Sequence, residues 1–124
     1  MPVPILKQGD YLIASIQSAL SDTEVLALRD ELTEQVGRFR ARGVVVDVTA
    51  LDVIDSFVAR ALRTIALTAK LRGAETVLVG IQPDVAMAMV QFRLNLEPLN
   101  TALDLEEGLA VLQESVQGSP GNEH

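Results

Sequence analysis

Cysteine is absent from the sequence, and this absence excludes several kinds of chemistry at once. A chain without thiols forms no disulfide, holds no thiolate zinc site and has no cysteine nucleophile. Tryptophan is also absent and aromatic residues make up 3% of the chain, which leaves little material for aromatic cages or base-stacking platforms. The single histidine is the last residue, His124, which excludes a Ser-His-Asp triad held in fixed geometry.

Phosphate-cradling loops and an excess of positive charge are also missing. Neither GxxxxGK[ST] nor GxGxxG occurs in the 124 residues, and we expect no cofactor. The chain has 10 Lys and Arg against 17 Asp and Glu, which gives a formal net charge of −7. Because nucleic-acid binding depends on neutralising phosphates, neither DNA nor RNA is expected as a partner.

Long apolar runs are absent as well. No positively charged start precedes an apolar stretch, and no segment approaches the roughly 18 uncharged residues of a membrane-spanning helix. We therefore expect a cytoplasmic protein without a membrane partner. Hydrophobic residues make up 48% of the chain, and its length suits one domain over residues 1–117, followed by a flexible polar tail at 118–124.

Short β-branched and apolar runs alternate with segments whose apolar residues recur every three or four positions. Strands are predicted at residues 3–6, 11–16, 44–48, 76–81 and 101–103. Helices are predicted from a capping box at Ser21 and Glu24 until Gly43, from Ser56 until Gly73, from Pro83 to about Phe92, and from Leu105 to Val116. This order indicates an α/β domain with a mixed sheet of four to five strands and about four helices.

Acidic residues gather before the second helix and near the start of the first: Asp47, Asp52 and Asp55, with Asp22. Carboxylates of this kind could hold magnesium, as in a receiver domain or a small metal-dependent enzyme. A receiver domain also needs a late lysine beside its acidic residues, and the last lysine here, Lys70, lies at a helix end. The alternative is that Asp52 and Asp55 are turn and cap residues, which aspartate commonly is.

Ser56 follows Asp55 in the first turn of the second predicted helix, where unpaired backbone N–H groups favour an anion. A phosphoryl group on Ser56 would add about −1.5 to −2 charges within reach of Asp52 and Asp55. Attraction by the helix end and repulsion by the carboxylates would then oppose each other, so the modification would change the surface more than the fold. The alternative is a serine that satisfies the helix start.

Around these residues the sequence resembles the STAS domains of bacterial anti-sigma-factor antagonists, and among them the small RsbS-type subunit of the stressosome. The likeness rests on VVVDVTALDVIDSFVAR at residues 44–60, LRGAETVLVGIQP at 71–83 and LDLEEGLAVL at 103–112, and it covers residues 2–117. The resemblance implies a protein without enzymatic activity. Simple antagonists often have a small hydroxyl residue and glycine after the phosphorylated serine. Phe57 and Val58 follow here, which agrees better with the stressosome branch.

The resemblance also implies a mechanism and partners. The serine that corresponds to Ser56, after the aspartate that corresponds to Asp55, is phosphorylated in the family by an RsbT-type serine kinase. Unmodified antagonist captures that kinase, phosphorylation releases it, and a phosphatase resets the serine. The expected partners are therefore this kinase, the phosphatase and RsbR-type STAS paralogues.

Two surfaces are candidates for contacts. Arg60 and Arg63 share a helix face beyond Ser56 and could meet acidic groups of a kinase, while Phe57 or Val58 supplies apolar contact; the alternative is an ordinary solvated face. The apolar segment at residues 85–90 exceeds what one buried stripe needs, so part of it is expected to face another subunit or to cover the core. Self-association alone, with Ser56 only a cap, would make the chain a purely structural subunit.

Overall fold

The computed structural model of the chain describes residues 3–93 and 95–117, with side chains up to residue 115. The predicted polar tail at 118–124 and the side chain of Val116 therefore lie outside the described residues. The elements follow the predicted order. They are β1 (Ile5–Gln8), β2 (Tyr11–Ser15), α1 (Asp22–Phe39), β3 (Gly43–Asp47), α2 (Ser56–Leu71), β4 (Glu75–Val79), α3 (Pro83–Gln91), β5 (Asn100–Ala102) and α4 (Leu105–Gln117).

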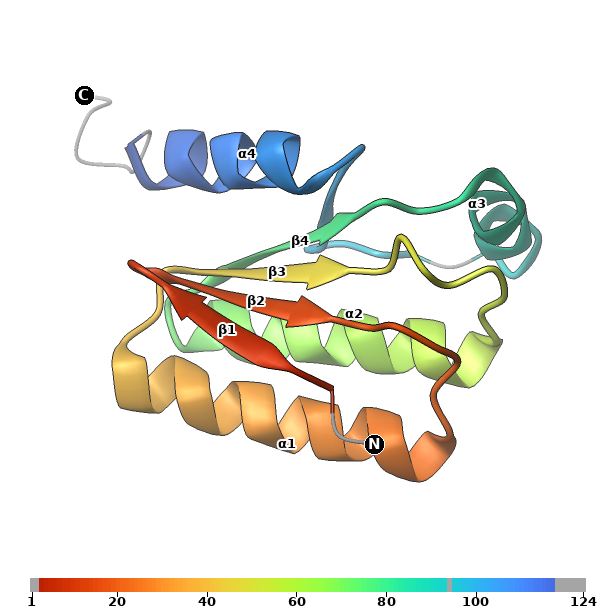
Figure 1. The fold of residues 1–124 in the computed structure, drawn as a ribbon, viewed down its shortest axis with the longest axis horizontal. Coiled ribbons are helices and arrows are strands. Elements are labelled where there is room, and N and C mark those ends of the chain that lie inside the picture. Colours follow the sequence, from red (N-terminus) through yellow and green to blue (C-terminus); the bar gives the residue numbers. More distant parts are fainter. Residues whose placement is uncertain (1–2, 94, 118–124) are drawn as a thin grey trace.

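The strands form one mixed sheet in the order β1-β2-β3-β4-β5. β1 is antiparallel to β2, and the turn between them uses Gly9 at a φ of 59°, while the other three pairs of neighbours are parallel. Helices α1 and α2 lie side by side under one face, and α4 covers the opposite face (Figure 1). The predicted α/β class, with a mixed sheet and four helices, is confirmed.

Alternate side chains of the central strands enter two separate cores, because successive residues of a strand point to opposite faces. Toward α1 and α2 lie Leu12, Val44, Val46 and Leu78. Toward α4 lie Ile13, Val45, Val77 and Val79, packed with Leu112. Coverage on both faces explains why β3 and β4 read as almost continuous apolar runs.

The prediction that Gly43 ends the first helix is wrong. Helix α1 ends four residues earlier, at Phe39, where Arg40 takes a left-handed conformation (φ 51°) and the Ala41 N–H donates to the Val36 carbonyl. Gly43 is instead the first residue of β3. A Cβ at that position would lie 2.8 Å from Leu112 Cδ1, so this glycine allows α4 to approach the sheet closely.

Candidate functional site

The carboxyl ends of β2, β3 and β4 meet at one edge of the sheet because these three strands are parallel. The loops that follow them lead into α1, α2 and α3, and these helices therefore begin at the same edge (Figure 1). In α/β sheets this edge is the usual place for a functional site. Ser56, the first residue of α2, lies there.

Asp55 caps α2. Its carboxylate accepts a hydrogen bond from the Val58 backbone N–H at 2.8 Å, which confirms the interpretation of Asp55 as a cap residue. The alternative that Ser56 satisfies the helix start is wrong, because Asp55 occupies that position. The Ser56 side chain is partly exposed, and its hydroxyl makes no hydrogen bond to any residue that the structure describes. Within the described chain, this hydroxyl is thus not committed to holding the helix start.

The loop before Ser56 is tied to the neighbouring loop after β4. The Asp47 carboxylate accepts hydrogen bonds from the Thr49 backbone N–H at 2.9 Å and from the Thr49 hydroxyl at 2.7 Å. The Gln82 side-chain amide donates to the Thr49 carbonyl at 2.7 Å, across 33 residues of sequence. Gly80, at a φ of 80°, packs directly against the Thr49 side chain. Sequence reasoning missed Gly80 and Gln82 in this role, although both lie in the quoted segment 71–83.

The acidic residues do not form a metal site in the described part of the chain. No group of three or more metal-ligating side chains comes together there, and Asp47 is engaged by Thr49. Asp52 and Asp55 are both exposed, and they precede Ser56 by four residues and one residue in the sequence. Asp22 is the exposed first residue of α1, at the same edge of the sheet. A small cavity of about 100 Å³ lies between the loops before α1 and α2, with Leu20 and Asp55 in its lining.

The predicted partner-binding residues divide into exposed and buried groups. Phe57 is 40% exposed, and Arg60 is exposed one turn beyond Ser56. Arg63 is partly buried, and its Nε has no hydrogen-bond partner among the described residues. Val58 is 5% exposed and belongs to the core under the sheet, so the expected partner contact through Val58 does not hold. Phe57 is the one of the two apolar candidates that a partner can reach.

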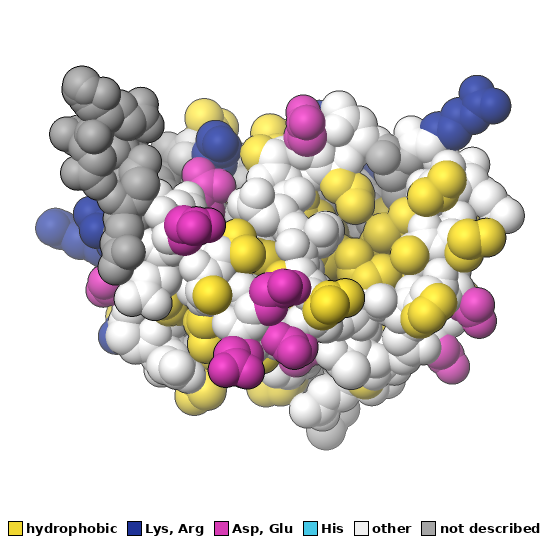
Figure 2. Space-filling model, turned by 90° about the horizontal axis from the view of Figure 1, so that it is seen from above, with side chains coloured by type: hydrophobic (Ala, Val, Ile, Leu, Met, Phe, Trp, Pro, Cys, Tyr) yellow, Lys and Arg dark blue, Asp and Glu magenta, His cyan; other side chains and the backbone are white. Residues whose placement is uncertain are grey.

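Helix α3 also exposes apolar side chains. Val85 and Met89 are buried, whereas Met87 and Val90 are 63% and 76% exposed. Figure 2 shows hydrophobic side chains gathered around a hollow on the right-hand side, which is the side where α3 lies in Figure 1. The segment 85–90 therefore covers the core with one face and leaves the other open; contact with another subunit stays a prediction.

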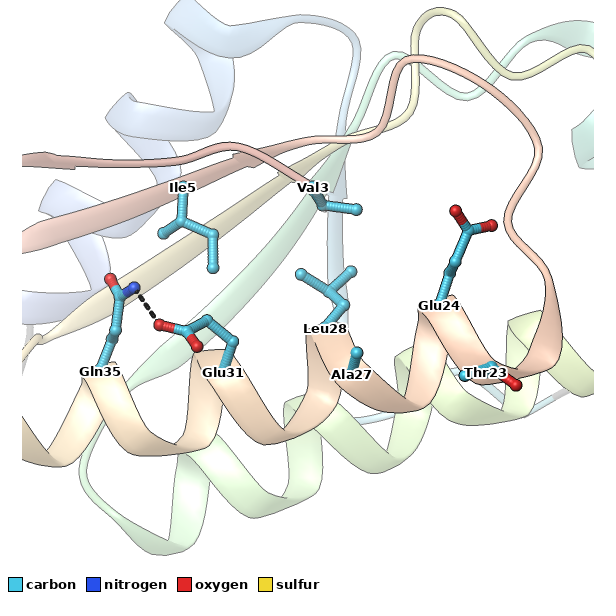
Figure 3. A pocket seen from close by; sticks show the side chains of 8 residues that line it. All are labelled: Val3, Ile5, Thr23, Glu24, Ala27, Leu28, Glu31 and Gln35. Atoms are coloured by element: carbon cyan, nitrogen blue, oxygen red, sulfur yellow. Dashed lines mark hydrogen bonds between the residues drawn. The ribbon is translucent and has the colours of Figure 1, made fainter. Parts of the chain in front are cut away.

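A groove of about 460 Å³ runs between β1 and α1 at the edge of the sheet (Figure 3). Val3, Ile5 and Leu28 form its apolar wall, and Glu31 and Gln35 line it from α1, joined by a hydrogen bond of 2.7 Å. No local pattern in the sequence predicts this groove, because its walls come from segments that are at least 18 residues apart along the chain. None of the helices in the described part of the chain has the length and apolarity needed to cross a membrane.

Comparison with known proteins gives consistent matches. Residues 3–108 match the STAS domain family. The fold is similar to a serine-to-glutamate variant of RsbS from Moorella thermoacetica, with a TM-score of 0.81 and 37% identity over 93% of this chain and 97% of that one. It is also similar to a chain from a structure of the stressosome, described as a signal integration and transduction hub, with a TM-score of 0.75 and 36% identity over 92% of this chain and 99% of that one.

Among curated proteins, the RsbT co-antagonist protein RsbRA of Bacillus subtilis is 29% identical over 89 residues, which are 71% of this chain and 32% of that protein. The RsbT co-antagonist protein RsbRD of the same organism is 26% identical over 111 residues, which are 89% of this chain and 40% of that protein. The chain thus spans less than half the length of these two relatives.

Proposed function

Because this chain belongs to the STAS domain family, we propose that it is a cytoplasmic antagonist that captures an RsbT-type serine kinase and releases it when Ser56 is phosphorylated. It is a stressosome-type protein, similar to RsbS over most of its length and to part of the RsbR co-antagonists. Its partners in the proposal are the kinase, RsbR-type paralogues and a phosphatase that resets Ser56. The chain itself carries out no reaction in this scheme.

The free hydroxyl of Ser56 is the observation that carries the proposal. Asp55 already caps α2, so the Ser56 hydroxyl has no hydrogen-bonding task among the described residues, and the residue is partly exposed. A phosphoryl group would add about −1.5 to −2 charges beside the exposed carboxylates of Asp52 and Asp55. The N-terminus of α2 attracts that charge, so the helix stays folded while the surface changes.

Similar proteins support a serine kinase as the partner. The two curated relatives are named co-antagonists of RsbT, and one similar structure has glutamate in place of a serine, a substitution that mimics part of a phosphate charge. In this chain Phe57, Arg60 and Arg63 would contact the kinase, with a cationic helix face meeting acidic groups. Phosphorylation would place negative charge next to that face and weaken the contact.

The proposal is tested by incubating the chain with ATP and the cognate kinase, followed by intact mass measurement and site mapping. We expect one phosphate on Ser56, and we expect Ser56→Ala to keep kinase capture and to lose both phosphorylation and release. Ser56→Asp should weaken capture partly. Ser18→Ala, which removes an exposed hydroxyl at the same sheet edge, is the control and should behave like the unaltered chain. Full phosphorylation of Ser56→Ala would overturn the assignment.

A purely structural subunit is the second candidate, and the exposed apolar side chains of Met87 and Val90 favour it. In that case subunit contacts are the whole function, and no kinase binds. Size measurement of the isolated chain, together with a kinase pull-down, separates the two functions. Assembly without kinase capture would favour the structural role, whereas kinase capture that depends on the state of Ser56 would exclude it.

A further inference from the structure

The exposed face of helix α2 carries several apolar side chains. Five exposed residues recur at intervals of three and four positions and therefore follow one side of the helix. We call them the α2 stripe: Phe57, Arg60, Thr64, Leu67 and Leu71. The three apolar members are 40%, 38% and 89% exposed, respectively.

The charge of α2 is opposite in sign to that of the whole chain. The chain has a net charge of −7, yet α2 contains three basic residues, Arg60, Arg63 and Lys70, and no acidic one. Lys70 pairs with Glu75 at 3.6 Å, whereas Arg60 and Arg63 form no ion pair with a described residue. The buried Nε of Arg63 also has no hydrogen-bond partner there. An acidic partner would thus be repelled by most of this chain and attracted to α2, where Arg60 is the charged member of the α2 stripe and Arg63 lies outside it.

The α2 stripe is longer than the distance over which one phosphate acts electrostatically. Leu71 lies 15 residues beyond Ser56, and an α-helix rises 1.5 Å per residue, which separates the two by about 22 Å. Exposed charges are largely screened beyond about 8 Å at physiological ionic strength. A phosphate on Ser56 therefore acts on Phe57 and Arg60 but not on Leu67 and Leu71.

We propose that the α2 stripe is the docking surface for an acidic and apolar face of the kinase, with two halves that respond differently to phosphorylation. This inference rests on the proposed function and extends it. The near half, Phe57 and Arg60, loses its attraction when Ser56 is phosphorylated. The far half, Leu67 and Leu71, contributes the same apolar contact in both states. Phosphorylation therefore weakens the complex without removing all affinity.

The test is calorimetric titration of the cognate kinase into the full chain, unmodified and phosphorylated on Ser56. We expect Leu71→Ser to weaken binding by about 5- to 10-fold in both states, as loss of a buried leucine contact does. Arg60→Gln should weaken binding of the unmodified chain only. Leu103→Ser is the matched control, because Leu103 is 82% exposed and lies outside α2, and it should leave affinity unchanged. Thermal unfolding confirms that each variant is folded.

The outcomes distinguish failure of this inference from failure of the proposed function. If the unaltered chain binds the kinase, and Leu71→Ser binds it with the same affinity as Leu103→Ser, the docking surface lies elsewhere, while the proposed function stands. If Leu71→Ser weakens kinase binding by the unmodified chain but not by the phosphorylated chain, the two halves of the stripe do not respond separately to phosphorylation. If Leu71→Ser changes the size of the assemblies that the chain forms and leaves its affinity for the kinase unchanged, the α2 stripe contacts a second copy of this chain. Absence of any kinase binding by the unaltered chain overturns both proposals.

Discussion

Asp55 accepts a hydrogen bond from the backbone N–H of Val58 at 2.8 Å, and this contact separates the tasks of two adjacent residues. Asp55 holds the start of α2, while Ser56 next to it carries a hydroxyl without a partner among the described residues. A modification of Ser56 therefore leaves the helix cap in place. The division explains how one site can change the surface of the domain without loosening its fold.

This division predicts unequal costs for two neighbouring substitutions. Asp55→Ala should lower the free energy of unfolding by about 1 kcal/mol, because the Val58 N–H loses its acceptor at the helix start. Ser56→Ala should change it by less than about 0.5 kcal/mol. Urea unfolding of both variants measures the difference, with Asp55→Asn as the control that keeps a capping oxygen. An equal loss for Ser56→Ala would show that the serine has a structural role.

The close packing of Gly80 against Thr49 predicts a second effect on stability. Gly80→Ala should lower the free energy of unfolding by about 1–3 kcal/mol, because it forces a left-handed backbone on alanine and pushes Cβ into the Thr49 side chain. Gly73→Ala is the control: Gly73 has a similar φ of 92°, but nothing lies within 4 Å of the added Cβ. Gly73→Ala should therefore lower the free energy of unfolding by less than Gly80→Ala does. Thermal or urea unfolding of both variants measures the difference. Equal costs would mean that the contact with Thr49 contributes nothing.

Local patterns in the sequence predict the elements because these patterns act over a few residues. The capping box at α1 is confirmed, with the Glu24 N–H donating to Ser21 Oγ at 3.1 Å and the Ser21 N–H donating to the Glu24 carboxylate at 2.9 Å. The end of α1 could not be predicted, since Arg40 rather than a glycine takes the left-handed position. Gly43 has its role through Leu112, which is distant in sequence.

The candidate site was predictable to a similar degree. Ser56 and Asp55 are adjacent in sequence, so their places at the helix start follow from local spacing. The hydrogen bond from the Gln82 side chain to the Thr49 carbonyl depends on the parallel pairing of β3 and β4, which no local pattern specifies. The burial of Val58 likewise depends on how α2 lies against the sheet, and only the three-dimensional structure separates it from the exposed Phe57.

The capping box also predicts a pH dependence. The Ser21 backbone N–H, which donates to the Glu24 carboxylate, lowers the pKa of Glu24 from its ordinary value of 4.5. A carboxyl whose pKa is lower in the folded state stabilises the fold above its unfolded pKa, and this contribution is lost as the pH falls through the folded pKa. The difference in unfolding free energy between the unaltered chain and Glu24→Gln should therefore be constant near neutral pH and shrink below 4.5. Urea unfolding across this range measures it, and a difference independent of pH would contradict the prediction.

Arg60 should also determine the acidity of a phosphate on Ser56. The two residues are four positions apart on α2, and long helical side chains point toward the N-terminus, so we expect the Arg60 guanidinium to extend toward the turn that contains Ser56. An adjacent cation favours the doubly charged phosphate and lowers its second pKa, which is ordinarily about 6. Arg60→Gln should therefore raise the second pKa of phosphorylated Ser56 by about 0.1–0.4, from a pair worth about 0.2–0.5 kcal/mol.

Phosphorus NMR titration of the phosphorylated chain measures this pKa directly, without a kinase or any other partner present. Arg38→Gln is the matched control, because Arg38 lies on α1 and pairs with Glu34 at 2.9 Å. It removes the same charge from the chain and should leave the phosphate pKa unchanged. An equal rise in both variants would mean that the phosphate responds to the net charge of the chain. A rise in Arg60→Gln alone would identify Arg60 as the cation that the phosphate engages, and in the proposed function this engagement would make Arg60 unavailable to the kinase.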